Sequence, residues 1–126
     1  MITVKSEGVN YLGSLVDKGI LVDVAEEKGG RGAGISPYEL LEAALASCMN
    51  ITLRMSMEKH NIAYDNLEIT VKLNKSDPDK TIFEYSYKID SNLDEIQKAK
   101  ILRVLEQCPV KKALAKEIEF MFMGSK

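Results

Sequence analysis

A long, buried helix is predicted from residues 36–49, which read SPYELLEAALASCM. Ser36 suits the N-cap, Pro37 suits the first helical position, and Glu39 falls where it can complete a capping box. Nothing in the sequence breaks this pattern before Lys59, so we expect a helix from Pro37 to about Lys59. Its first half is apolar on nearly every side, which is typical of a helix that is covered all round.

The small residues of this predicted helix indicate a homodimer. Ala43, Ala44, Ala46 and Ser47 allow another backbone to approach closely. A chain of 126 residues offers one sheet to cover such a helix, so the second face of the helix needs a further partner. The economical partner is a second copy of the same chain, and most soluble oligomers are symmetric assemblies of this kind.

The remaining sequence predicts an α+β fold. Strands are indicated where apolar and polar residues alternate with a period of two, and helices where caps and breakers bound a longer segment. The expected elements are two or three strands within the first 27 residues, ending with Ile20–Val24 after a turn at Asp17-Lys18-Gly19; strands at 67–73 and 83–89 joined by a turn at 74–80; a helix capped by Ser91 or Asn92; a short helix at about 109–116; and a last strand at 118–122. The order β-β-α-β-β-α-α-β favours antiparallel pairing, and the length suits one domain over residues 1–126.

The composition excludes several classes of partner. Lys and Arg number 17 and Asp and Glu number 19, for a net charge of −2 with the two signs mixed. That balance argues against a nucleic-acid binder and against a polybasic membrane contact. No apolar run reaches the roughly 18–20 residues of a membrane helix, and the first residues lack the basic and apolar regions of a signal peptide. We therefore expect a cytoplasmic protein whose partners include neither nucleic acid nor a membrane.

The glycine-rich segment at residues 28–34 reads KGGRGAG and carries four glycines in seven residues. Such a segment is unsuited to a regular helix or strand, because glycine loses the most backbone entropy on ordering. Its side chain of chemical interest is Arg31. A loop of this kind can bend tightly and place the guanidinium against another surface.

The two cysteines, Cys48 and Cys108, lie 60 residues apart. Neither has a CxxC partner, so a zinc site is not indicated, and structural disulfides are rare in the cytosol. From the residues alone, two interpretations stay open. The thiols are either buried and pack as small apolar groups, or they are chemically reactive.

The surroundings predicted for the two thiols differ. Cys108 precedes Pro109 and should stand at a helix N-terminus, which favours a thiolate. Cys48 is mid-helix on an apolar face that we expect to be buried, so it would need a cation from elsewhere, for which Arg31 is the candidate. His60 lies 12 residues from Cys48, roughly 18 Å along the helix, and is interpreted as a solvated residue at the helix end.

Two motifs resemble the OsmC/Ohr family of osmotically inducible and organic-hydroperoxide-resistance proteins. The first is the stretch 36–48, with the proline 11 residues before the cysteine, and the second is Cys108-Pro109-Val110 before a short helix. Together they extend the resemblance from Gly29 to Phe122.

This resemblance implies a fold and an activity. The fold would be an intertwined homodimer in which antiparallel sheets wrap two long central helices. The activity would be thiol-dependent reduction of organic hydroperoxides or hydrogen peroxide, at a site on the subunit boundary. Cys48 would be the peroxidatic thiolate and Cys108 the resolving thiol. A dithiol, in some members a lipoyl group, would reduce the disulfide, and no metal or organic cofactor would be needed.

The sequence departs from the family pattern at the site. Characterised members have a glutamate directly after the proline, which orients an arginine on the thiolate. Here that position is Tyr38 and the acid follows at Glu39, while Arg31 is the only arginine before the helix. The implied catalytic set is therefore Cys48, Cys108, Arg31 and Glu39. The pattern fits a divergent branch, so the alternative is a redox or ligand-binding protein without significant peroxidase activity.

Overall fold

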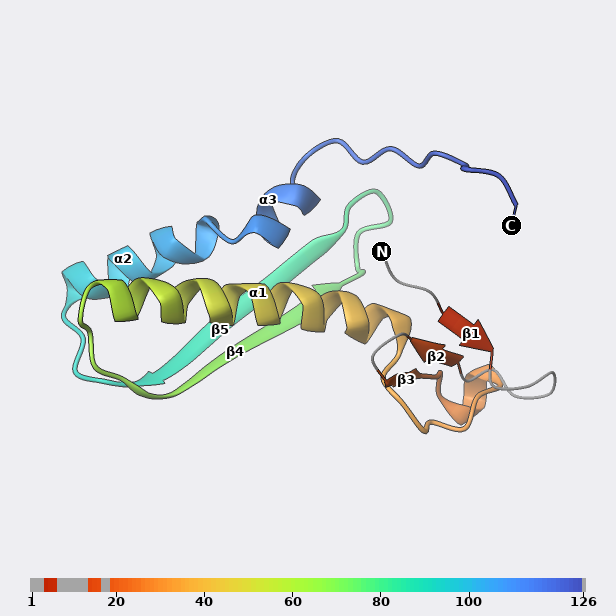
Figure 1. The fold of residues 1–126 in the computed structure, drawn as a ribbon, viewed down its shortest axis with the longest axis horizontal. Coiled ribbons are helices and arrows are strands. Elements are labelled where there is room, and N and C mark those ends of the chain that lie inside the picture. Colours follow the sequence, from red (N-terminus) through yellow and green to blue (C-terminus); the bar gives the residue numbers. More distant parts are fainter. Residues whose placement is uncertain (1–3, 7–13, 17–18, 126) are drawn as a thin grey trace. The chain divides into compact units, whose positions relative to one another are not determined.

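A computed structural model describes residues 4–6, 14–16 and 19–125 of the chain (Figure 1). Contacts divide the chain into two compact units, residues 1–43 with 73–83, and residues 44–72 with 84–126. The single domain over residues 1–126 stays a prediction. The elements in chain order are the strands β1 (Val4–Ser6), β2 (Ser14–Val16) and β3 (Ile20–Val22), the 3-10 helix η1 (Glu26–Lys28), the helix α1 (Pro37–Lys59), the strands β4 (Asp65–Asn74) and β5 (Ile82–Asp90), and the helices α2 (Glu95–Glu106) and α3 (Pro109–Leu114).

The first unit contains a three-stranded antiparallel sheet in the order β1-β2-β3. Val16 pairs with Ile20, and Gly19 between them has a φ of +85°, which suits a tight turn. The Asp17-Lys18 part of the predicted turn lies outside the described residues. β3 ends at Val22, earlier than predicted, and Val22 also forms an isolated parallel bridge with Ile35.

The glycine-rich segment is irregular after η1, as predicted, and it is organised around the carboxylate of Asp23. This side chain is only 2% exposed and accepts backbone N–H bonds from Val24 at 2.8 Å and from Arg31 and Ala33 at 3.1 Å each. A Cβ on Gly30 would overlap the Val24 carbonyl and the Asp23 carboxylate, so only glycine fits there. The backbone that carries Arg31 is thus fixed by a buried acid.

The predicted bounds of the long helix α1 are confirmed. Its N-terminus has the expected capping box, because Ser36 Oγ accepts from Glu39 N–H and Glu39 Oε1 accepts from Ser36 N–H, both at 3.1 Å. One stripe of the helix is buried at a spacing of four residues: Leu45, Met49, Leu53 and Met57.

The apolar face predicted to surround Cys48 is not buried in the single chain. Leu41, Ile51 and Met55 are 44%, 54% and 65% exposed, and Cys48 itself is half-buried. The buried stripe lies one position further along the helix, where the side chains of the same chain cover it. The prediction overestimated the burial of this face. A helix that is apolar on all sides has no pattern that tells which face is covered by the same chain.

The second sheet pairs β4 with β5, and the predicted antiparallel hairpin is confirmed with longer strands (Figure 1). α2 begins after Asp94, whose side chain accepts from Gln97 N–H at 2.7 Å in a capping box. The predicted cap at Ser91 or Asn92 is therefore wrong, and the Ser91 hydroxyl donates instead to the Ala63 carbonyl.

The predicted last strand at 118–122 is absent. Residues 117–125 form neither strand nor helix, and Phe120 and Phe122 are 93% and 88% exposed. A strand requires a neighbouring strand for its backbone hydrogen bonds, and within the described single chain none lies beside this segment. Among the described helices, none is both long and apolar enough to cross a membrane.

Candidate functional site

The two cysteines meet in the second unit. Cys48 lies on α1, and Cys108 is the residue that caps α3. Pro109 at the first position of α3 starts the short helix and has no N–H of its own. The first N–H group of α3, from Val110, donates to Cys48 Sγ at 3.5 Å. The Cys108 side chain lies close enough to Cys48 to lower the pKa of the Cys48 thiol as a donor, and both residues are free cysteines. The fold thus brings together two thiols that are 60 residues apart in sequence.

The two thiols differ in exposure. Cys108 is completely buried, whereas Cys48 is half-buried. A small molecule that approaches from solvent therefore meets Cys48 first. The Thr52 hydroxyl, one turn further along α1, lies 4.0 Å from Cys48 Sγ.

Hydrogen bonds favour the charged form of Cys48. Burial raises the pKa of this thiol, but the bonds from the Cys108 thiol, the Val110 N–H and the Thr52 hydroxyl lower it, and the net pKa lies below its ordinary value. None of the three groups that lower the pKa of Cys48 is a cation. The role expected for Arg31 at this thiol stays a prediction.

Cys108 has the opposite character. Burial, and the hydrogen bond that its proton makes to Cys48, raise the pKa of Cys108 above its ordinary value, although the Lys111 and Val110 N–H groups act in the other direction. The predicted helix N-terminus is present at Cys108, but it does not make this residue the better thiolate. The two shifts therefore favour ionisation of the Cys48 thiol over ionisation of the Cys108 thiol.

The bond between the thiols can be tested with two substitutions of Cys108. Serine retains a proton donor toward Cys48, whereas alanine removes it. We expect the pKa of Cys48 to be higher in Cys108→Ala than in Cys108→Ser, because only the alanine variant loses this stabilisation of the thiolate. Ultraviolet thiolate absorbance as a function of pH measures both values. Equal values in the two variants would contradict the proposed bond.

The other predicted site residues lie in the first unit. Arg31 is exposed in the glycine-rich segment, and Glu39 uses its carboxylate in the capping box of α1. The Lys75 ammonium stacks 4.0 Å from the centre of the Tyr38 ring. The catalytic roles suggested for Arg31 and Glu39 stay predictions. His60 is exposed at the end of α1, and its Nδ1 bonds the Ser56 carbonyl at 2.8 Å.

Sequence reasoning missed the roles of Thr52 and Val110. The i to i+4 spacing from Cys48 places Thr52 on the same side of the helix, so this contact had a local signal. The sequence signal for the Val110 N–H is weaker. The second position of any helix has an N–H without an intrahelical partner, so this feature does not single out Val110. Within the described part of the chain, no three His, Cys, Asp or Glu side chains gather as metal ligands.

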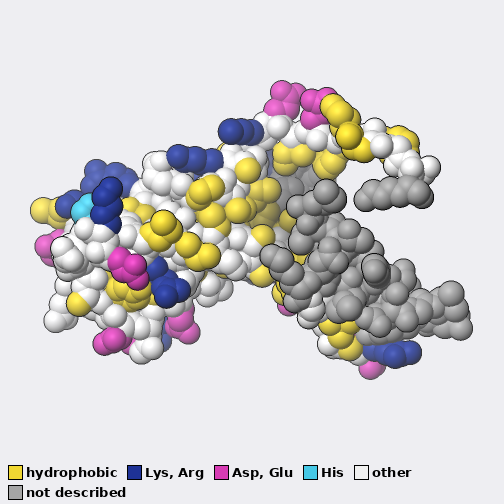
Figure 2. Space-filling model, in the orientation of Figure 1, with side chains coloured by type: hydrophobic (Ala, Val, Ile, Leu, Met, Phe, Trp, Pro, Cys, Tyr) yellow, Lys and Arg dark blue, Asp and Glu magenta, His cyan; other side chains and the backbone are white. Residues whose placement is uncertain are grey.

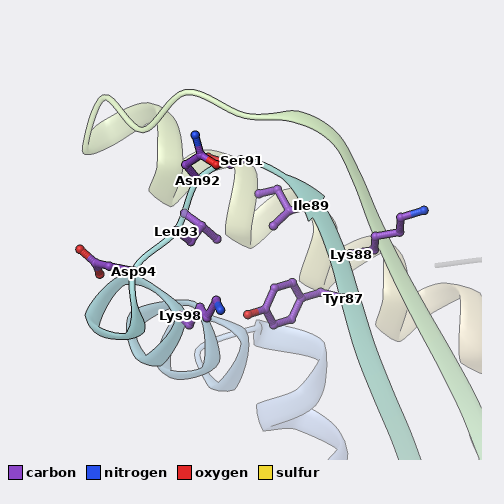
Figure 3. A pocket seen from close by; sticks show the side chains of 8 residues that line it. All are labelled: Tyr87, Lys88, Ile89, Ser91, Asn92, Leu93, Asp94 and Lys98. Carbon is purple, nitrogen blue, oxygen red and sulfur yellow. The ribbon is translucent and has the colours of Figure 1, made fainter.

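A separate, open hollow of about 830 Å³ lies where β5 leads into α2. Figure 3 shows the Tyr87 hydroxyl pointing toward the Lys98 side chain across it. Lys98 is already paired with Glu95 at 3.3 Å, and none of the described residues around the hollow is a cysteine. The thiol pair is therefore the better candidate for chemistry.

Comparison with known proteins places the chain among relatives. The family model described as OsmC-like protein matches residues 29–122. The fold is similar to that of an OsmC-like protein from Mycoplasma pneumoniae, at 20% identity and a TM-score of 0.73 over 90% of this chain and 85% of that one. It is also similar to the organic hydroperoxide resistance protein OhrB of Bacillus subtilis, at 22% identity and a TM-score of 0.59 over 91% and 89%. No curated protein matches the sequence.

Proposed function

Because the chain belongs to the OsmC-like protein family, we propose that it is a cysteine-based peroxidase for small organic hydroperoxides or hydrogen peroxide. The observation that carries this proposal is the thiol pair, in which a half-buried Cys48 with a lowered pKa lies beside a buried, protonated Cys108. A nucleophile and a resolving thiol are the two parts that such chemistry needs.

In the proposed first step, the Cys48 thiolate attacks the terminal oxygen of the hydroperoxide. A sulfur–oxygen bond forms and the oxygen–oxygen bond breaks, so that the peroxide is reduced and Cys48 is oxidised to a sulfenic acid. The leaving alkoxide takes up a proton and departs as the alcohol. The hydrogen bonds to Cys48 hold the thiolate in place before this step.

In the proposed second step, the sulfur of Cys108 attacks the sulfenic sulfur of Cys48. A disulfide forms and water leaves, carrying the sulfenic oxygen and the Cys108 proton. An external dithiol then supplies two electrons and two protons and returns both thiols by exchange. The resemblance to the family suggests a lipoyl-bearing protein as this reductant.

The proposal is tested by titrating the reduced protein with cumene hydroperoxide. One equivalent should consume two thiols per chain and leave a Cys48–Cys108 disulfide, which peptide mapping identifies. A protein that forms this disulfide with a dithiol–disulfide reagent, but does not react with hydroperoxides, would support thiol redox exchange instead. Retention of both thiols under both treatments would contradict any redox role.

Arg31 is proposed to assist this reaction. A guanidinium favours a nearby thiolate, and its two-pronged geometry can hold peroxide oxygens. We expect Arg31→Ala to lower the rate of Cys48 oxidation by about tenfold or more, about 1.4 kcal/mol of barrier. The melting temperature should change little, because Asp23 bonds Arg31 through its backbone.

Stopped-flow oxidation by cumene hydroperoxide measures the effect of Arg31→Ala. Lys28→Ala, which removes another exposed cation near the same segment, serves as the matched control and should react as fast as the parent. A parental rate in Arg31→Ala would show that Arg31 does not act on the reaction.

We also propose that the protein is a homodimer. Several large apolar side chains of α1, together with Phe120 and Phe122, are exposed in the single chain. Large exposed apolar patches mark sites of association. A second copy that packs on α1 near Ala44 and Ser47, and that supplies a partner for the segment at 118–122, would cover it. A folded monomer in sedimentation at high dilution would contradict this assembly.

A further inference from the structure

A groove lies between α1 and α2 in the second unit, away from the thiol pair. Its volume is about 570 Å³, which is within the range of small-molecule sites. Leu53, Met57 and Ile101 form its floor, and these side chains are at most 5% exposed. None of the described lining residues belongs to the thiol pair or bonds to it. The groove therefore needs an explanation of its own.

The rim of this groove is basic. His60, Lys100 and Arg103 line it, and none of its described lining residues is acidic. The chain contains one histidine, and Figure 2 shows Lys and Arg side chains gathered around it. His60 uses Nδ1 for the Ser56 carbonyl, which leaves Nε2 for a ligand.

The two long cations of the rim are not engaged elsewhere. Among the described residues, neither Lys100 nor Arg103 takes part in an ion pair, whereas the neighbouring Lys98 is paired with Glu95. Both side chains are exposed, so they can turn toward a bound group. Charges of one sign around an apolar floor concentrate ligands of the opposite sign.

We propose that this groove binds an amphipathic anion with a single acyl chain and a terminal carboxylate. The guanidinium of Arg103 can hold a carboxylate by two parallel hydrogen bonds, and the Lys100 ammonium supplies further donors. The acyl chain lies over the apolar floor, where its burial stabilises the complex. A neutral lipid would leave the basic rim unused, and a small polar anion would leave the floor uncovered.

The length of the groove fits this ligand. Its lining residues extend from Leu53 on α1 to His60, which directly follows this helix, and from Gln97 to Val104 on α2. Each of these segments rises roughly 10 Å at 1.5 Å per residue, which is comparable to an extended decanoate. Because the site shares no residue with the thiol pair, this inference stands without the proposed peroxidase activity.

The experiment is an isothermal titration of decanoate, below its micelle concentration, into the full-length reduced protein. Decanol and butyrate, which lack the charge and the long chain respectively, should each bind at least tenfold more weakly. The double variant Lys100→Gln with Arg103→Gln should lose at least tenfold in decanoate affinity. The matched control Lys72→Gln with Lys116→Gln changes the charge equally at exposed residues outside the groove and should bind as the parent does.

A second variant tests the apolar part of the groove. Val104→Phe adds bulk to the groove wall, and it should weaken decanoate without affecting the thiol pair. Alkylation of both thiols by iodoacetamide should leave decanoate binding intact.

Three results would overturn the proposal. The first is equal affinity in the parent and the Lys100→Gln, Arg103→Gln variant. The second is loss of decanoate binding on alkylation of the thiols, which would place the ligand at Cys48. The third is binding to phosphatidylglycerol vesicles without affinity for decanoate, which would assign the basic rim to a membrane surface.

Discussion

Replacing Cys48 with serine is expected to abolish hydroperoxide reduction, with kcat/KM lower by about a thousandfold or more, roughly 4 kcal/mol of barrier. A serine hydroxyl stays protonated at neutral pH and is a poor nucleophile toward peroxide. The donors from Val110 and Thr52, which lower the pKa of the Cys48 thiol, cannot compensate for this difference. Consumption of cumene hydroperoxide with a dithiol reductant measures the loss.

Cys108→Ser provides the matched comparison, because it removes the second thiol but leaves the nucleophile. This variant should still consume one equivalent of peroxide, and it should accumulate a Cys48 sulfenic acid that dimedone traps and mass spectrometry detects. The parent should instead form the disulfide. Sulfenic acid on Cys108 in the Cys48→Ser variant, at the parental rate, would reverse the assignment of the two roles.

Replacing Asp23 with alanine is expected to lower the free energy of unfolding by about 3 kcal/mol. The buried carboxylate accepts N–H bonds from Val24, Arg31 and Ala33, and alanine would leave these three donors without their partner. Urea denaturation measures the loss of stability. Hydrogen exchange should show faster exchange at the amides of Arg31 and Ala33 in particular.

Two controls accompany the Asp23 variant. Glu27→Ala removes an exposed acid of the neighbouring 3-10 helix and should change stability little. Asp23→Asn retains one carbonyl acceptor in place of two carboxylate oxygens, and it should fall between the parent and Asp23→Ala. Unchanged amide exchange at Arg31 in Asp23→Ala would show that the segment is held by other contacts.

The elements that the sequence predicted well are those with local causes. The bounds of α1 follow from Ser36, Pro37 and Glu39, whose capping bonds involve residues within one turn. The β4–β5 hairpin follows from alternation, because a strand with one covered face repeats every two residues. The incorrect cap of α2 also had a local signal, since Asp94 stands three residues before Gln97.

The prediction of a last strand at 118–122 was wrong for a different reason. The residues at 118–122 have the composition of a strand, but a strand exists only when another strand accepts and donates its backbone bonds. In the described single chain that partner is absent, and the apolar side chains of the segment are exposed. The sequence indicates that this segment prefers the strand conformation. Only the segments that lie beside it in space determine whether its backbone groups find hydrogen-bond partners.

The candidate site shows the same division. The sequence identifies the two cysteines, the helix break at Cys108-Pro109 and the start of a short helix. Each of these features depends on neighbouring residues. The tertiary structure alone shows that the Val110 N–H and the Cys108 side chain lie beside Cys48, and that the pKa of Cys48 is lowered as a result. A pKa depends on groups that are close in space and on the loss of water, and here those groups come from segments about 60 residues apart. No local pattern in the sequence records this approach, so the position of Val110 and Cys108 beside α1 decides which thiol has the lowered pKa.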